Sequence, residues 1–199
     1  MQMNKASSSV KITPDYVLSL KKPTESYLCS LSANIYNIQF LAFKIRDVES
    51  NQVFFSIEKE PEDEEIKAEV MEDINEDELR TVRYHFGPNF FKLKEIGTTL
   101  VFSVGEKPLK NFRMIERHYF KEKLIQSFDF NFPFCMPNCT NSWESIYSIP
   151  NLESKVIEDM IKSPWTTKSD SFYFVGNEIV MHNKAEYSYS EHLDEEEGD

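Results

Sequence analysis

The sequence predicts an all-β sandwich with short helices in its N-terminal region and its C-terminal half. About eight short segments either alternate apolar and polar residues or are rich in β-branched and aromatic residues, and turn residues separate them at short intervals. No alternating strand–helix pattern runs along the chain, so a doubly wound sheet is not expected. The length of 199 residues suits one domain with tails, and 40% hydrophobic residues suffice for one core.

Two segments carry helix signals. Thr13-Pro14-Asp15 supplies an N-cap, a proline for the first helical position and a first-turn acid, which predicts a helix to about Leu20. Residues 154–163 carry an apolar stripe at helical spacing and end before Pro164. A further helical stretch is predicted around 66–74, within a strongly acidic part of the chain.

The strand signals run through the rest of the chain. In 34–47 the apolar positions change face near 41–43, which indicates a β-bulge. Gly176-Asn177 predicts a tight hairpin between the last two long strands. The predicted strands are 34–47, 52–57, 82–86, 98–104, 111–120, 127–135, 171–175 and 178–182, with a further short strand at 187–189.

Charge divides the chain into a body and acidic segments. Residues 58–79 hold 12 acidic and 2 basic side chains, and residues 191–199 hold 6 acidic ones without Lys or Arg. These two segments account for more than the whole net charge of −12, so the remainder is mildly basic. We therefore predict a disordered tail at 1–11, a folded domain at 12–190 with a mobile acidic insertion at 58–80, and a disordered acidic tail at 191–199. The net charge argues against a general nucleic-acid binder.

Several classes of site and location find no support. Three cysteines, Cys29, Cys135 and Cys139, make a disulfide framework improbable on parity, and no second cysteine pair accompanies the last two, so no metal is expected. No G-x-G-x-x-G, P-loop or nucleophile elbow occurs, and no cofactor is expected. No apolar stretch suits a membrane span or a signal peptide, which predicts a cytoplasmic location.

The most informative stretch is 112–134, where seven aromatic residues occur in 23 positions. A period of two places Glu116 and His118 on one strand face together with Phe112, Met114 and Phe120. In the next strand, the phenylalanines at 128, 130, 132 and 134 share a face. Such a phenylalanine face beside a carboxylate and an imidazole predicts a deep apolar cavity with a polar group near its mouth. It would suit a ligand with a long apolar body and a hydrogen-bonding head.

Plainer interpretations remain open on pattern alone. Alternating phenylalanines also describe an ordinary sandwich core, and Tyr84 and Tyr173 fit half-buried tyrosines. Glu116 and His118 would form a surface pair if the opposite strand face were the buried one. Arg113 and Arg117 lie on that opposite face, and because arginine prefers solvent, they favour an inward Glu116.

The chain also resembles a known family. The segments PDYVLSL, YLCS, NIYNIQF, FKIRD, VRYHF, NFRMIERHYF, SFDFNFPFC, SDSFYFV and MHNKAEYSYS are similar to those of the uncoordinated-119 lipid-binding chaperones, relatives of the delta subunit of rod cGMP phosphodiesterase. The resemblance covers about residues 12–190. It implies a non-enzymatic, immunoglobulin-like β-sandwich whose sheets part to admit a lipid between them.

The resemblance also implies partners. Uncoordinated-119 proteins bind N-terminally myristoylated proteins, among them G-protein alpha subunits and ciliary cargo, and release them when a GTP-loaded Arf-like small GTPase docks. A monomer in the cytoplasm, and in cilia, is the corresponding expectation. The delta-subunit branch prefers C-terminal prenyl groups, which makes a prenyl carrier the alternative within this class.

Matched by motif, the lipid-binding residues implied are aromatic or apolar apart from one carboxylate and one imidazole. The chain departs from the family pattern at Pro133 and in the stretch 142–145, which bears on client preference. The implied residues are Phe43, Ile45, Tyr84, Phe86, Phe90, Glu116, His118, Phe120, Phe128, Phe130, Tyr173 and Tyr187.

Two functions from other classes were weighed against the carrier. A hydrolase could use Glu116 as base and His118 as orienter, but no nucleophile or oxyanion motif accompanies them. A lipid-independent adaptor could pair with its partners through a sheet edge. It would bind acylated and unacylated peptides alike.

Overall fold

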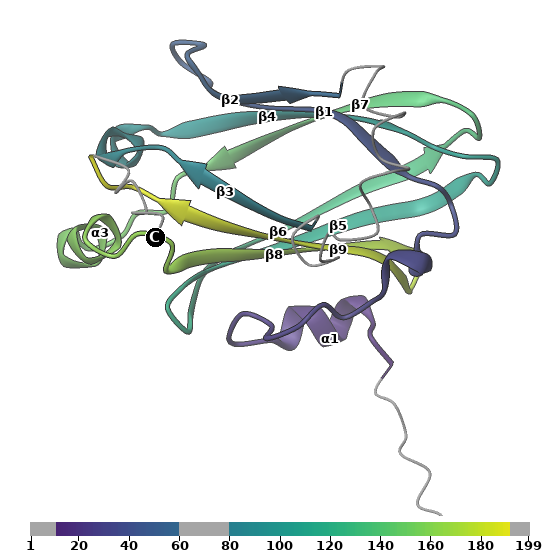
Figure 1. Cartoon of the computed structure of the whole chain (residues 1–199), viewed down its shortest axis with the longest axis horizontal. Coiled ribbons are helices and arrows are strands. Elements are labelled where there is room, and N and C mark those ends of the chain that lie inside the picture. The colour runs from purple at the N-terminus through teal and green to yellow at the C-terminus, as the bar shows by residue number, and fades with distance from the viewer. Residues whose placement is uncertain (1–10, 60–79, 192–199) are drawn as a thin grey trace, which may run out of the picture.

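The computed structural model describes residues 11–59 and 80–191. Two β-sheets pack face to face, with short helices at the periphery, and the predicted all-β sandwich is confirmed (Figure 1). The helix predicted at 66–74 and most of the predicted tails and acidic insertion lie outside the described residues.

Nine strands and four short helical elements make up the described part of the chain. The N-terminal helix is capped as predicted, because the Thr13 side chain accepts a hydrogen bond from the Tyr16 amide. The elements are α1 (Pro14–Ser19), η1 (Leu31–Ala33), β1 (Gln39–Asp47), β2 (Val53–Glu58), β3 (Thr81–His85), η3 (Pro88–Lys92), β4 (Glu95–Ser103), β5 (Leu109–Phe120), β6 (Lys123–Cys135), β7 (Thr140–Ser148), α3 (Ser154–Ile161), β8 (Thr167–Val175) and β9 (Glu178–Ser188).

The first sheet has the strand order β2-β1-β4-β7 and the second β3-β9-β8-β5-β6. Every pairing is antiparallel except that of β3 with β9, which is parallel. The predicted bulge in β1 is confirmed, since its register against β4 shifts between Phe40 and Ala42. The bulge turns both Phe40 and Phe43 toward the space between the sheets.

Several predicted strand boundaries were wrong, and one strand was missed. Strands β4, β6 and β8 begin three or four residues earlier than predicted, and β9 continues six residues beyond the predicted end. Residues 34–38 are not part of a strand, because Asn37 adopts a positive φ of 49° and the Asn34 side chain bonds both backbone groups of Ile38. The short strand expected at 187–189 is the end of β9. Strand β7 was missed, because serines, an asparagine and a glutamate interrupt its four strand-favouring residues; nine antiparallel register pairs with β4 hold it in the sheet.

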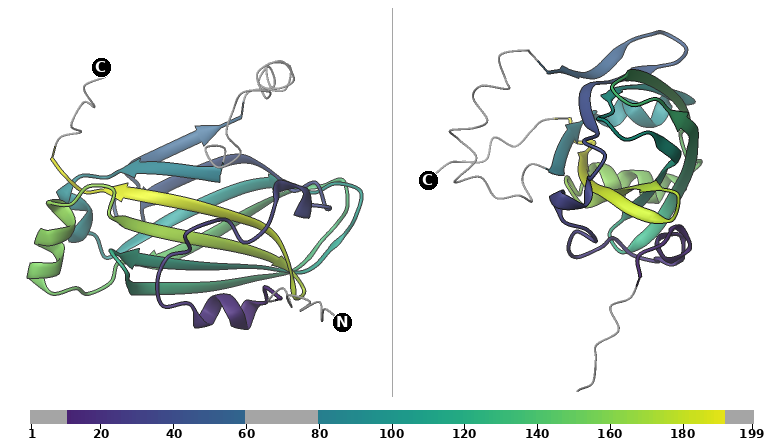
Figure 2. Two further views of the ribbon diagram at one scale, coloured as in Figure 1. Left: turned by 60° about the horizontal axis from the view of Figure 1, so that its bottom comes forward. Right: turned by 90° about the vertical axis from the view of Figure 1, so that its right-hand side faces the viewer.

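The chain before β1 crosses the outer face of the five-stranded sheet (Figures 1 and 2). We call residues 12–30 the N-terminal strap. Its Val17 is fully buried against Ile115, Phe172 and Phe174, which point outward from β5 and β8. Both faces of these two strands are therefore buried, one by the strap and one by the opposite sheet.

A buried polar network fixes the strap. The Asp170 carboxylate, 1% exposed, accepts hydrogen bonds from the Thr24 amide (2.8 Å) and hydroxyl (3.0 Å), from His182 Nε2 (3.1 Å) and from Lys184 Nζ (2.8 Å). His182 Nδ1 accepts from the Leu28 amide at 3.0 Å, so the imidazole links strap and sheet in one tautomer. Each buried polar group is thereby satisfied by another.

This network predicts acid sensitivity. Burial lowers the pKa of His182 below 6.5, against the opposing effect of Asp170. Burial raises the pKa of Asp170, but the hydrogen bonds from His182 and the charge of Lys184 outweigh it and leave the pKa lowered. An unfolded histidine takes up a proton as the pH falls through 6.5 and the buried ring does not, so the free energy of unfolding is expected to fall between pH 7.5 and 5.5. Asp170 adds a further loss below about pH 4.

Urea unfolding at several pH values checks this. The His182→Gln variant is expected to show a flatter dependence of the free energy of unfolding on pH between 7.5 and 5.5 than the wild type. An unchanged slope in that variant would contradict the assignment to His182.

Candidate functional site

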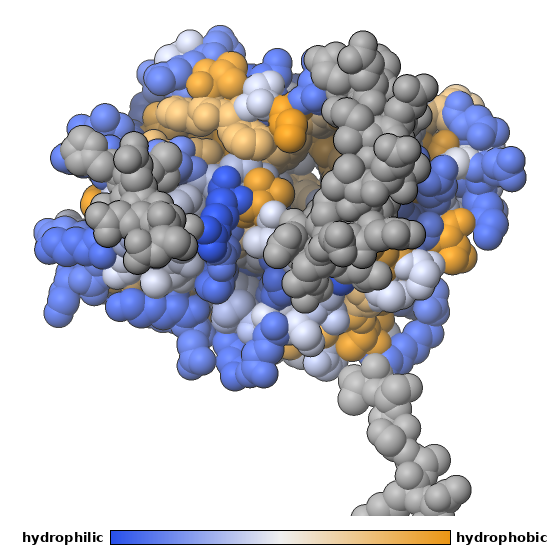
Figure 3. All heavy atoms as spheres, viewed as in Figure 1, coloured by the Kyte–Doolittle hydropathy of each residue, from blue (hydrophilic) through white to orange (hydrophobic). Residues whose placement is uncertain are grey.

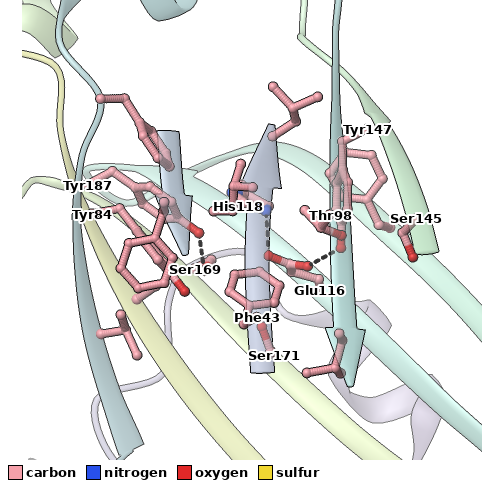
Figure 4. Close-up of a pocket in the computed structure, with 18 of the residues that line it drawn as sticks. Phe43, Tyr84, Thr98, Glu116, His118, Ser145, Tyr147, Ser169, Ser171 and Tyr187 are labelled. Carbon is pink, nitrogen blue, oxygen red and sulfur yellow. Dashed lines mark hydrogen bonds and ion pairs between the residues drawn. The ribbon is translucent and has the colours of Figure 1, made fainter. Parts of the chain in front are cut away.

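A cavity of about 700 Å³ lies between the two sheets. Strands β1, β2, β4 and β7 line it from one side, and β3, β5, β6, β8 and β9 from the other (Figure 4). Ile57 of β2 and Val82 of β3 line it and are 59% and 40% exposed, so the cavity reaches the surface between these two edge strands. Figure 3, in the orientation of Figure 1, shows apolar side chains along β2.

Small side chains create the space. Strand β8 alternates inward Ser169, Ser171 and Tyr173 with outward Asp170 and Phe172. Large residues at such inward positions ordinarily fill the roughly 10 Å between packed sheets, whereas serine leaves most of that thickness empty. Ala42, Thr98, Ser145 and Ala185 do the same on other strands.

A carboxylate stands inside this space. Glu116 points inward from β5 with its side chain 13% exposed; its Oε2 accepts from the Tyr147 hydroxyl at 2.9 Å, and its Oε1 lies 2.9 Å from His118 Nε2 (Figure 4). Glu116 and His118 come from the second sheet and Tyr147 from the first, so this hydrogen-bonded group bridges the sandwich. The cavity therefore combines an apolar wall with a strong hydrogen-bond acceptor.

Four tyrosines surround this carboxylate. Burial, followed by the negative charge of Glu116, raises the pKa of Tyr84, Tyr147, Tyr173 and Tyr187. Their hydroxyls therefore stay protonated and can donate hydrogen bonds at any physiological pH. The Tyr187 hydroxyl lies 2.9 Å from the Ser169 hydroxyl, within hydrogen-bond distance.

Aromatic contacts join the two sheets near the surface opening. Tyr84 of β3 stacks on Phe86 and Tyr187 and meets Phe55 of β2 edge-on, with ring centroids 4.9 Å apart. The ring centroid of Phe43 in β1 lies 6.4 Å from that of Tyr84. Among the described residues, β2 and β3 share no backbone pairing, so these side-chain contacts join the two sheets on this side.

Most of the residues implied by the resemblance line the cavity. Two do not: Phe120 packs with Met160 and Tyr189 at one end of the sandwich, and Phe130 packs on Trp143 and Tyr147 beside the cavity. The ten that line it are Phe43, Ile45, Tyr84, Phe86, Phe90, Glu116, His118, Phe128, Tyr173 and Tyr187.

The inward orientation predicted for Glu116 is right, but half of its stated reason is wrong. Arg113 does face solvent, paired with Asp129. Arg117 is only 3% exposed, because it donates to the Leu20 carbonyl of the strap at 2.6 Å and to Ser127. Of the predicted phenylalanine face, Phe134 is 50% exposed and does not line this cavity.

The polar lining of the first sheet was not predicted from the sequence. Thr98, Ser145 and Tyr147 face Glu116 from β4 and β7 (Figure 4). No run of small residues marked them, because Thr98 and Ser145 are single small residues between large ones on the same strand faces. The second sheet did carry a signal, the small hydroxyl residues Ser169-x-Ser171 of β8 at positions where a sandwich core should have large apolar ones. Pairing these serines with Glu116 requires the sheet order.

Other kinds of site find no support in residues 11–59 and 80–191. The cysteines there are free thiols, burial raises the pKa of Cys135 to about 11, and no cluster of potential metal ligands occurs in these ranges. No helix in this part of the chain is long and apolar enough to cross a membrane.

The fold and the cavity together define a class: an all-β sandwich that encloses an apolar space with a carboxylate inside it. The family model described as "GMP-PDE, delta subunit" matches residues 32–189. The chain belongs to this family and, within it, to the unc-119 proteins.

Relatives from several animals support this assignment. "Protein unc-119" of Caenorhabditis elegans is 52% identical over 179 residues, which cover 90% of this chain and 80% of that protein. "Protein unc-119 homolog B" of Homo sapiens is 50% identical over 181 residues, or 90% and 72% of the two chains. "Protein unc-119 homolog" of Drosophila melanogaster is 48% identical over 195 residues, or 91% and 74%.

Proposed function

We propose that this protein is a cytoplasmic and ciliary carrier that binds N-terminally myristoylated proteins by enclosing the acyl chain between its sheets. The observation that carries the proposal is the cavity of about 700 Å³, lined by aromatic side chains and holding Glu116 within its wall. G-protein alpha subunits and ciliary proteins are the proposed clients.

The apolar lining is large enough to account for tight binding. A myristoyl chain has about a dozen methylenes, and burial at ~0.8 kcal/mol each gives roughly 10 kcal/mol. Association costs at least several kcal/mol of this. A single myristoyl chain binds a bilayer only marginally, so a carrier with this cavity competes with the membrane.

Selectivity for an N-terminal acyl group would come from Glu116. A myristoyl group is joined to the chain by an amide, and the amide N–H groups that follow it can donate to this carboxylate. His118 or a tyrosine hydroxyl can donate to the acyl carbonyl. The first residue is glycine, whose missing side chain permits the close approach.

The same geometry argues against the hydrolase alternative. Within the described cavity wall, His118 contacts Glu116 through Nε2, and its ring lies edge-to-face with Phe128 and tilted against Tyr187. A serine-type mechanism needs a nucleophilic hydroxyl on that imidazole. We therefore propose binding without turnover.

Release is proposed to follow docking of a GTP-loaded Arf-like GTPase. Such a partner would bind outside the cavity and act by favouring a narrower sandwich, because a ligand enclosed between sheets is not displaced from outside. The aromatic contacts of Tyr84 with Phe43 and Phe55 can open and close without breaking a backbone pairing.

Fluorescence polarisation tests the proposal. The probes are two labelled glycine-starting peptides that differ only in the myristoyl group, and a C-terminally farnesylated peptide. Tight binding of the myristoylated peptide alone is expected, with a faster off-rate when the GTP-loaded Arf-like protein is added. Preference for the farnesylated peptide would indicate a prenyl carrier, and equal binding of all three would indicate a lipid-independent adaptor.

A further inference from the structure

The carboxylate of Glu116 lies inside the cavity and is held by hydrogen bonds. Glu116 has two hydrogen-bond partners, the Tyr147 phenol and the His118 imidazole, and no Lys or Arg of the described residues forms an ion pair with it. Lys184 also lines the cavity, but its ammonium group bonds Asp170 (2.8 Å) and Thr24 in the strap network. Lys59 is the other cationic residue that lines the cavity. Among the ion pairs of the described residues none joins Glu116 to a lysine or arginine, so hydrogen bonds and not a direct cationic partner hold this carboxylate.

The negative charge of Glu116 affects the pKa of tyrosines in the cavity wall. Beyond burial itself, Glu116 raises the pKa of Tyr84 and Tyr173, whose hydroxyls lie on different strands. A ligand carboxylate placed near Glu116 would therefore be repelled by it. The repulsion is strong because the buried cavity screens charge less than water does.

We infer that Glu116 makes the cavity selective against free fatty acids, so that it accepts an acyl chain joined through an amide and rejects the same chain ending in a carboxylate. The inference rests on the proposed function. An amide brings no charge and offers an N–H to Glu116, whereas an ionised carboxylate can only accept hydrogen bonds. Free fatty acids share the hydrocarbon tail of the client, so apolar contacts cannot distinguish the two ligands.

The size of the discrimination follows from Coulomb's law. Two like charges about 6 Å apart, at an effective dielectric constant of about 20, weaken binding about a hundredfold. The carboxylate can avoid this repulsion only if the complex takes up a proton. Whatever fatty-acid binding the wild type retains is therefore expected to strengthen as the pH falls.

Competition against a labelled myristoylated peptide tests the inference. The competitors are sodium myristate and N-myristoylglycinamide, both below their aggregation limits, and the measured quantity is the ratio of their inhibition constants. The wild type is expected to bind the amide at least about thirtyfold more tightly than the acid. In Glu116→Gln the ratio is expected to fall to within about fivefold, because the side-chain oxygen can still accept from Tyr147 while the charge is gone.

Glu144→Gln is the matched control. Like Glu116→Gln, it removes one negative charge, but Glu144 lies on the exposed outer face of β7, where it pairs with Arg46. This variant should leave the ratio of inhibition constants unchanged. A wild-type ratio near one, or an unchanged ratio in Glu116→Gln, would overturn the inference and leave the carrier function standing. A wild type that does not bind the labelled peptide would overturn both. Should Glu116→Gln fail to fold, the wild-type ratio and its pH dependence still decide the matter.

Discussion

Replacing Asp170 by alanine is expected to lower the free energy of unfolding by about 3–5 kcal/mol, the largest effect of any single polar substitution considered for this protein. Asp170 is 1% exposed and bonds Thr24, His182 and Lys184. Its removal leaves the Lys184 ammonium, whose side chain is 18% exposed, without its carboxylate and the fully buried His182 without its acceptor. It also detaches the N-terminal strap from the sheet. Urea or guanidinium unfolding measures the change.

Asp129→Ala is the control for this substitution. Like Asp170, Asp129 pairs with a basic residue on the outer face of the second sheet. It accepts two hydrogen bonds, of 2.8 and 2.6 Å, from Arg113, but its side chain is 42% exposed. An ion pair of this exposure contributes at most about 1 kcal/mol. If both variants lost the same free energy, the strap network would have no special role in stability.

Replacing Ser171 by tryptophan is expected to weaken binding of a myristoylated peptide at least about a hundredfold. Ser171 points into the cavity from the middle of β8, opposite Glu116 in β5 (Figure 4). An indole there occupies space that the acyl chain is proposed to fill. Excluding three or four methylenes costs roughly 3 kcal/mol at ~0.8 kcal/mol each, which corresponds to about a hundredfold in affinity.

Asn131→Trp supplies the comparison, because it adds the same ring to an exposed position in β6. Thermal unfolding should show both variants folded, since filling an existing space need not displace the core. Fluorescence polarisation should then show a loss of binding for Ser171→Trp alone. Wild-type affinity in a folded Ser171→Trp would mean that the lipid binds elsewhere.

The sandwich was predictable because its signals are local. The N-cap of α1, the hairpin at Gly176-Asn177 and the bulge in β1 each depend on a few neighbouring residues, and all three occur as predicted. Strand β7 was not predictable in the same way. Its serines and asparagine have weak strand preference, and pairing with β4 is what holds it extended.

The candidate site could likewise be predicted only where its signals are local. The alternation in 112–120 determined that Glu116 and His118 share a strand face, and the resemblance assigned that face to the cavity. The alternation could not show that Arg117 is buried, because the N-terminal strap that covers it lies about 100 residues earlier in the sequence. Nor could it show that Phe120 and Phe130 pack beside the cavity rather than lining it.

By itself the sequence determined the fold class, the existence of eight of the nine strands in the described part of the chain, and the strand face shared by Glu116 and His118. Period-two alternation is a property of a single strand, which is why it could be predicted locally. Only the tertiary structure decided which hydroxyl residues face Glu116, where the cavity opens and what covers the outer face of the second sheet. Those features depend on which strands become neighbours and how far apart the sheets lie. Residues as distant as Thr98, Glu116, Tyr147 and Ser171 share one cavity because the fold brings their strands together.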